Sequence, residues 1–309
     1  MGELSAKKNV RKIVDKYNFR FSKSLGQNFL VDEDALDEIV CSADINSEDT
    51  VLEIGTGIGT LTQKLCQSAK KVVAVEIDST LLPILEETLN GYDNYEIVNQ
   101  DILKTDVKKL LEDLEITGKI KVVANLPYYI TTAIIMKLLQ EDIQLDSMVL
   151  MLQKEVADRL NAEKSTKDYG SLSIAVQFYC DTDIVAVIGK ESFIPQPKVD
   201  SCVIRLKKRD VKKYNVKDER LFFKLVRASF AKRRKTIVNS ILGYEDFTDK
   251  DRIIKALEES NIDLKARGES LGIEQFAELS DNFYDLLFDK GDCELPPKEK
   301  SVHRRTTQG

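Results

Sequence analysis

Four consecutive residues, 125–128 (Asn-Leu-Pro-Tyr), have the types needed to hold a planar base that carries an amino group. The run before them, 121–124 (Lys-Val-Val-Ala), predicts a buried strand that stops at Pro127, because proline has no amide hydrogen to donate. Asn125 then lies at the carboxyl end of a strand, where open α/β sheets bind ligands. Its amide oxygen and the carbonyl of Leu126 can both accept hydrogen bonds from one exocyclic amine, and the ring of Tyr128 offers a stacking face. The alternative interpretation is an ordinary strand followed by a proline turn.

A second candidate for chemistry is the glycine-rich loop that follows the short apolar run 50–54. Gly55, Gly57 and Gly59 allow a sharp turn and let backbone amides approach a ligand closely. A nicotinamide-binding loop has a similar start, but Leu61 and Thr62 stand where its third glycine is expected. The loop alone therefore indicates a nucleotide-containing cofactor without choosing between cofactors.

Two acidic residues end the next two predicted strands. Glu76 follows residues 71–75 and can hold both hydroxyls of a ribose. Asp101 follows the strand predicted at 95–98 and can accept a hydrogen bond from an adenine amine, with Ile77 and Ile102 placed to sandwich the ring. Either acid alone is typical of a surface charge or a helix cap. Three strand ends with ligand-suited groups in chain order favour an adenosine-containing cofactor.

The elements that must position these residues alternate between strand and helix. Strand, glycine loop, helix, strand and acid are the opening of a doubly wound parallel sheet, so the fold class is α/β. The alternation continues through a helix at 131–140, a strand at 147–152 and a helix at 154–160. Two strands at 183–189 and 200–206 predict an antiparallel pair at the end of the sheet. Beyond about residue 216 the pattern is helical only, at 218–241, 249–260 and 273–288.

Composition limits the classes of protein. A chain of 309 residues exceeds one comfortable core, so two domains are expected, and no run has transmembrane length. The five cysteines form no C-x-x-C pair and the single histidine is His303, which argues against a zinc site, a disulfide framework and histidine-based catalysis. We expect no metal, reduced thiols, a cytoplasmic protein and, by default, a monomer.

The net charge of −6 conceals two basic segments. Residues 1–23 hold seven Lys or Arg against two acids, and residues 203–240 hold fourteen against three. No acid occurs from Leu221 to Ser240, although solvated helix faces usually mix both signs. This pattern favours contact with RNA phosphates through the cations of the predicted helix 218–241. These cations are Arg220, Lys224, Arg227, Lys232, Arg233, Arg234 and Lys235.

Six motifs in order resemble the KsgA (RsmA) family of ribosomal RNA adenine N6-dimethyltransferases. They are KSLGQNFL at 23–30, E-x-G-x-G-x-G-x-L-T at 53–62, NLPYY at 125–129, YGSLS at 169–173, F-x-P-x-P at 193–197 and AKRRK at 231–235. The resemblance covers residues 20–288. It implies a Rossmann-like class I methyltransferase sheet with a small all-helical C-terminal domain. The implied reaction is S-adenosylmethionine-dependent dimethylation of two adjacent adenosines in the 3′-terminal hairpin of 16S rRNA.

The resemblance also implies roles for individual residues. Asn125, Leu126 and Tyr128 would hold the target base, and Phe193 would pack on its other face. The residues implied at the cofactor are Asn28, Leu30, Gly55, Glu76, Asp101 and Asn125, with Gly57 and Gly59 shaping the loop. From composition alone, residues 193–199 are typical of a stiff polyproline linker.

The expected organisation is a basic extension at 1–20, a methyltransferase domain at 21–209, a helical RNA-binding domain at 210–289 and a disordered tail at 290–309. Three other functions stay open on the sequence. A 23S rRNA adenine dimethyltransferase would share the fold, whereas a non-catalytic RNA-binding assembly factor would keep it without turnover. A nicotinamide dehydrogenase would leave Asn125 and the basic helix unexplained.

Overall fold

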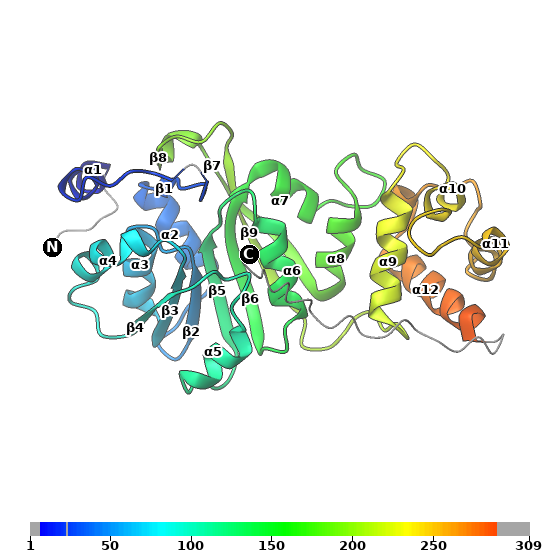
Figure 1. Cartoon of the computed structure of the whole chain (residues 1–309), viewed down its shortest axis with the longest axis horizontal. Coiled ribbons are helices and arrows are strands. Elements are labelled where there is room, and N and C mark those ends of the chain that lie inside the picture. The colour runs from blue at the N-terminus through cyan, green and yellow to red at the C-terminus, as the bar shows by residue number, and fades with distance from the viewer. Residues whose placement is uncertain (1–6, 23, 289–309) are drawn as a thin grey trace, which may run out of the picture. The chain divides into compact units, whose positions relative to one another are not determined.

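The computed structural model describes residues 7–22 and 24–288, which belong to two compact units (Figure 1). The first unit runs to Tyr214 and the second begins at Asn215, whereas the sequence analysis placed this boundary after residue 209. The tail expected to be disordered, at 290–309, lies outside the described residues.

The first unit is built on a seven-stranded sheet with the order β4-β3-β2-β5-β6-β9-β7. Strands β2 to β6 are parallel, and β9 is antiparallel to both of its neighbours. The antiparallel end of the sheet is therefore confirmed. The bounds of the strands are β2 Thr50–Ile54, β3 Lys71–Glu76, β4 Tyr95–Asn99, β5 Ile120–Asn125, β6 Leu145–Gln153, β7 Cys180–Ile188 and β9 Ser201–Lys208.

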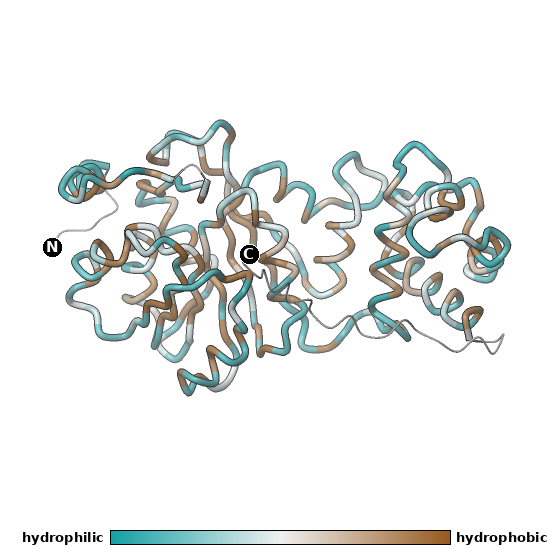
Figure 2. The backbone as a smooth tube through the Cα atoms, viewed as in Figure 1, coloured by the Kyte–Doolittle hydropathy of each residue, from teal (hydrophilic) through white to brown (hydrophobic). Residues whose placement is uncertain are grey.

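Helices cover both faces of the sheet, which explains why its central strands are apolar on both sides. In β5, Val122 and Ala124 contribute to one core cluster, and Val123 contributes to the other. Figure 2 shows the hydrophobic positions concentrated along these strands. The helices of the unit's sheet are α2 Glu33–Ser42, α3 Thr60–Ser68, α4 Leu82–Thr88, α5 Val107–Asp113, α6 Thr131–Gln140, α7 Lys154–Leu160 and α8 Ser171–Tyr179, with 3-10 turns η1 Ser79–Leu81 and η2 Lys190–Ser192.

A separate two-stranded sheet joins β1 (Phe29–Leu30) to β8 (Phe193–Ile194). Leu30 is paired with Phe193, so the segment interpreted from composition as a polyproline linker begins as a strand. Successive side chains of a strand point to opposite sides, and here Phe193 enters one core cluster while Ile194 packs against another.

The basic N-terminal segment contains a helix, α1 (Lys7–Lys16). Its Val10 is fully buried, and the helix packs against a small core cluster that includes Phe29, Ile58 and Leu81. The described part of the expected extension is thus an integral part of the first unit.

The second unit is helical, as expected, but the single helix predicted at 218–241 is wrong. The chain forms α9 (Glu219–Phe230), then a turn, then α10 (Ile237–Ile241). The hydroxyl of Ser240 donates to the carbonyl of Ala228 and accepts from the amide of Lys232, which satisfies backbone groups where α9 ends. The remaining elements are α11 Lys250–Glu259, η3 Gly268–Ser270 and α12 Ile273–Phe288.

Candidate active site

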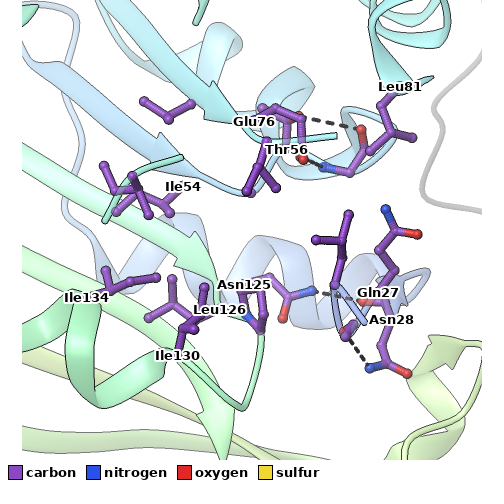
Figure 3. Close-up of a pocket in the computed structure, with 18 of the residues that line it drawn as sticks. Gln27, Asn28, Ile54, Thr56, Glu76, Leu81, Asn125, Leu126, Ile130 and Ile134 are labelled. Carbon is purple, nitrogen blue, oxygen red and sulfur yellow. Dashed lines mark hydrogen bonds between the residues drawn. The ribbon is translucent and has the colours of Figure 1, made fainter. Parts of the chain in front are cut away.

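A cavity opens at the carboxyl ends of β2, β3 and β5, beside the loop that leads into β1 (Figure 3). Most of the residues singled out in the sequence line it. They are Asn28, Leu30, Gly55, Gly57, Glu76, Ile77, Asp101, Ile102, Asn125, Leu126 and Tyr128. Gly59 and Phe193 are not among its lining residues.

The glycine loop needs its glycines for conformation and for space. Gly55, Gly57 and Gly59 all have positive φ, at 77°, 55° and 89°. A Cβ on Gly57 would lie 3.1 Å from the ring of Phe29, and one on Gly59 would lie 3.0 Å from the hydroxyl of Thr88. Gly59 precedes the first residue of α3, so it shapes the loop from outside the cavity.

Glu76 connects the tip of β3 to the glycine loop. One carboxylate oxygen accepts from the amide of Gly57 and the hydroxyl of Thr56, each at 3.1 Å, and the other accepts from the amide of Asp78 at 2.8 Å. The side chain is only 5% exposed, and burial raises the pKa of its carboxyl while these hydrogen bonds oppose the rise. Three hydrogen bonds fix the position of this carboxylate, and its remaining lone pairs can accept from the hydroxyls of a ribose.

Asn125 has its amide group oriented by the loop across the cavity. Its Nδ2 donates to the carbonyl of Asn28 at 3.2 Å, and Nδ2 of Asn28 donates to the carbonyl of Gly26 at 3.0 Å (Figure 3). With Nδ2 engaged, Oδ1 of Asn125 is the atom left to accept a hydrogen bond. Within the described residues no hydrogen bond ends on the carbonyl of Leu126 either. Two consecutive residues at the end of β5 thus line the cavity, and each keeps an acceptor without a hydrogen-bond partner among the described residues.

Aromatic and apolar side chains complete the cavity. The ring of Tyr128 is half-buried, its hydroxyl lies 2.7 Å from Oγ of Ser201, and burial raises its pKa. Tyr129, the last residue of the NLPYY motif, also lines the cavity and is 60% exposed, although no role was predicted for it. Ile77 is 49% exposed, whereas Ile102 is buried, so the two apolar residues expected around an adenine ring differ in accessibility.

Phe193 is expected from the resemblance to pack on one face of the target base, and it lies behind the lining of the cavity. It is 2% exposed and packs in the core with Leu30 and Ile188. Its pairing with Leu30 in the β1–β8 sheet places it in that core, and its role at the base stays a prediction.

Glu53, the first residue of the glycine-loop motif at 53–62, is a buried acid for which no role was predicted. It lies in β2, directly before the glycine loop, and is fully buried. Neither carboxyl oxygen has a hydrogen-bond partner among the described residues, nor does the buried hydroxyl of Thr62. Burial raises the pKa of Glu53 to about 8, with the nearby Thr62 hydroxyl opposing the rise and repulsion by Glu76 adding to it. The folded protein therefore holds the proton of this carboxyl more tightly than an exposed glutamate does.

The basic residues of the second unit divide into paired and unpaired cations. Lys224 contacts Glu245 at 3.2 Å and also Asp246, and Arg233 contacts Glu269 at 3.4 Å. Acids that are distant in sequence thus neutralise Lys224 and Arg233, two cations that were expected to contact RNA phosphates. Among the described residues, no ion pair involves the others, which are Arg220, Arg227, Lys232, Arg234 and Lys235.

Within the part of the chain that the structure describes, no group of three or more His, Cys, Asp or Glu side chains is arranged to hold a metal ion. No helix of that part is both long and apolar enough to cross a membrane.

The strand order, the antiparallel β9 and the cavity at the carboxyl edge define a Rossmann-like methyltransferase. Two solved structures agree. A dimethyladenosine transferase from Plasmodium falciparum superposes with a TM-score of 0.70 at 29% identity, covering 85% of this chain and 98% of that one. The 23S rRNA methyltransferase ErmE gives 0.62 at 27% identity, covering 83% and 99%.

The chain belongs to the ribosomal RNA adenine dimethylase family, whose model matches residues 18–281. A protein of Clostridioides difficile (strain 630) named ribosomal RNA small subunit methyltransferase A is 56% identical over 280 residues, which cover 91% of this chain and 96% of that protein. The chain is therefore a methyltransferase enzyme.

Proposed function

We propose that this enzyme transfers methyl groups from S-adenosylmethionine to N6 of two adjacent adenosines in the 3′-terminal hairpin of 16S rRNA, acting as a monomer in the cytoplasm. Family membership and the name of the Clostridioides difficile relative support the reaction class and the small-subunit target. The observation that carries the proposal is the bond that engages Nδ2 of Asn125, which leaves its Oδ1 and the carbonyl of Leu126, two groups of cavity-lining residues, available to accept.

The residues of the cavity fit the proposed cofactor. The fixed carboxylate of Glu76 suits a ribose, Asp101 suits an adenine amine, and Ile77 and Ile102 suit the faces of the ring. Asn28, Leu30 and Gly55 line the same cavity and would complete the site. When bound, S-adenosylmethionine supplies an electrophilic methyl group.

The protein's own residues would act mainly by positioning. The lone pair of an adenine amine is delocalised into the ring, so the amine is a weak nucleophile. Accepting both amine hydrogens at Asn125 Oδ1 and Leu126 O would hold the nitrogen in a geometry that frees the lone pair, with Tyr128 against the face of the base. No strong base is required, because the amine proton becomes acidic after transfer. The absence of a histidine from residues 7–22 and 24–288 is consistent with this chemistry.

The base must leave its stack to reach Asn125, which favours a loop or hairpin substrate. Unpaired cations of the second unit would hold the RNA backbone. A 23S rRNA target is the second candidate because of the similarity to ErmE. A non-catalytic assembly factor would have no use for the free acceptors of Asn125 and Leu126 in this cavity.

Incubation with labelled S-adenosylmethionine and immature ribosomal subunits tests the proposal. We expect label on two adjacent adenosines of the small-subunit RNA, identified by mapping the methylated positions. Label on 23S rRNA instead would show that the large-subunit RNA is the substrate. Cofactor binding without any transfer would favour the assembly factor.

The role of Asn125 can be tested separately. We expect Asn125→Ala to lower the single-turnover methylation rate by about 100-fold or more, since it removes one of the two acceptors. Binding of S-adenosylmethionine, measured by calorimetry, should fall less. The matched control is Asn161→Ala, another half-buried asparagine of the first unit, which binds Thr182 away from the cavity. Full activity of Asn125→Ala would refute the positioning role.

A further inference from the structure

The helix α1 has an apolar side that is already in use. Val10 is fully buried, and Ile13 and Val14 pack against the cluster that contains Phe29 and Leu81. Because this side is covered by the protein itself, α1 cannot insert it into a lipid bilayer as an interfacial membrane helix does. Only the opposite, polar side is available to a partner.

Both ends of α1 are fixed to the first unit. Near its C-terminus, Lys16 forms an ion pair with Glu87 at 2.5 Å, and the hydroxyl of the following Tyr17 donates to the same carboxylate. At its N-terminus, Nζ of Lys7 donates to the carbonyl of Glu191 at 2.6 Å. The helix therefore bridges α4 and η2, and the side chains on its polar side have a defined position.

Three cations on that polar side are unpaired. Lys8, Arg11 and Lys12 are exposed, and none makes an ion pair or side-chain hydrogen bond with a described residue. Their spacing of three and four residues places them on one face of the helix. Asp15 is the single acid within α1, and it forms no ion pair with them. The face keeps a net positive charge.

The apolar side of α1 packs directly behind the wall of the active-site cavity. Phe29, Ile58 and Leu81 pack with α1 on one side and line the cavity on the other. Lys8, Arg11 and Lys12 are exposed on the other side of this helix, on the same unit that contains the cavity. All of these residues lie in the first unit.

We propose that α1 is a phosphate-binding element that grips the RNA backbone beside the target adenosine, through Lys8, Arg11 and Lys12. The inference rests on the proposed function, because it takes the ligand of the cavity to be an RNA base. It assigns to the methyltransferase unit an RNA contact that is independent of the basic residues of the second unit.

The test replaces Lys8, Arg11 and Lys12 together by Gln, a good helix former that removes three charges. Binding of a labelled 3′-terminal 16S hairpin RNA is measured by anisotropy across a series of KCl concentrations, and methylation kinetics are measured on immature small subunits. We expect the slope of log affinity against log salt to fall by about 2 to 3 and KM for the RNA to rise about tenfold, with kcat and cofactor affinity unchanged.

The charge-matched control removes three other lysines of the first unit, as Lys70→Gln, Lys109→Gln and Lys119→Gln. Lys70 and Lys119 form exposed ion pairs with Glu48 and Asp210, and Lys109 lies on α5. Lys70 and Lys119 directly precede β3 and β5, so they lie at the amino ends of strands whose carboxyl ends form the cavity. The control should keep the wild-type slope and KM. Equal effects of the two triple variants, or no change in slope with the α1 variant, would overturn the inference. So would α1-dependent binding of anionic phospholipid vesicles in place of RNA. An inactive wild type would instead refute the proposed function, and the anisotropy measurement would still decide the role of α1.

Discussion

Glu53 is the residue whose environment is least favourable to its ordinary charge. It is fully buried below the glycine loop, without a hydrogen-bond partner for either oxygen among the described residues, and its pKa rises from 4.5 to about 8. Since the folded protein holds this proton more tightly than the unfolded chain does, the stabilisation is complete below pH 4.5. It is lost as the pH rises from 4.5 to 8.

We therefore expect Glu53→Gln to change how stability depends on pH. Between pH 5 and pH 8 the wild-type free energy of unfolding should fall by about 3 kcal/mol through this group, and the variant should lack that fall. Urea denaturation followed by circular dichroism at several pH values measures both proteins. The exposed Glu112→Gln on α5 serves as a control that keeps the wild-type curve. Parallel curves for Glu53→Gln and wild type would contradict the expectation.

The sequence predicts a single site residue well when a side chain suited to a ligand stands directly after an apolar run that predicts a strand. Asn125, Glu76 and Asp101 end apolar runs, and strand ends of a parallel sheet meet at one edge, so their convergence follows from local pattern. Phe193 differs, because its direction depends on pairing with Leu30, more than 160 residues away. No local sequence pattern predicts the pairing of β1 with β8. The sequence likewise gives no sign that Glu53 is left without partners.

The turn between α9 and α10 is the element that most changes the interpretation of the basic segment. It places Lys232, Arg233, Arg234 and Lys235 in a turn instead of on a helix. Gly268 explains how tightly the unit closes around α9, because a Cβ there would lie 2.7 Å from the carbonyl of Ser229. Neither proline nor glycine marks the break in the sequence, so a helical pattern through residue 241 was the natural prediction.

The paired and unpaired cations of α9 and of the turn after it should differ in their contribution to RNA binding. We expect Arg227→Gln with Arg234→Gln to lower the salt slope of RNA affinity by about 2, because both side chains are free to contact phosphate. Lys224→Gln with Arg233→Gln removes the same charge but breaks contacts to Glu245 and Glu269, so its slope should change less. Anisotropy with the hairpin RNA measures both. A larger effect of the second pair would show that ion pairing does not set the availability of these cations.

Strand and helix positions were predictable where apolar periodicity is strong. The bounds expected for β2 and α6 are those observed, and α12 begins and ends where predicted. The short β1 was not predictable, since two residues carry no periodicity and its partner β8 is distant in sequence. Long-range pairing, more than local propensity, limits such predictions.

At the scale of the whole molecule, the residues that line the cavity and the residues of the second unit come from separate parts of the chain. All residues that line the cavity precede position 135, well within the first unit. The first unit also contains its own core clusters and both of its sheets. Cofactor binding should therefore not require residues beyond Tyr214.

We expect a chain of residues 1–214 to bind S-adenosylmethionine with the affinity of the full-length protein. Its affinity for RNA should fall about 100-fold, because two linked contact surfaces reinforce each other. Calorimetry with the cofactor and anisotropy with the RNA measure the two effects, and a thermal melt with and without cofactor confirms folding. Loss of cofactor affinity in a folded truncated chain would show that the second unit supports the cavity.

The bond from Asn125 to the carbonyl of Asn28 has a consequence for how the enzyme ages. Asparagine side chains slowly lose ammonia and become aspartate. At position 125 this would set a negatively charged oxygen against the Asn28 carbonyl, so the bond that orients the side chain would be lost. If Asn125 aligns the amine as proposed, we expect such a spontaneous chemical lesion to slow methyl transfer.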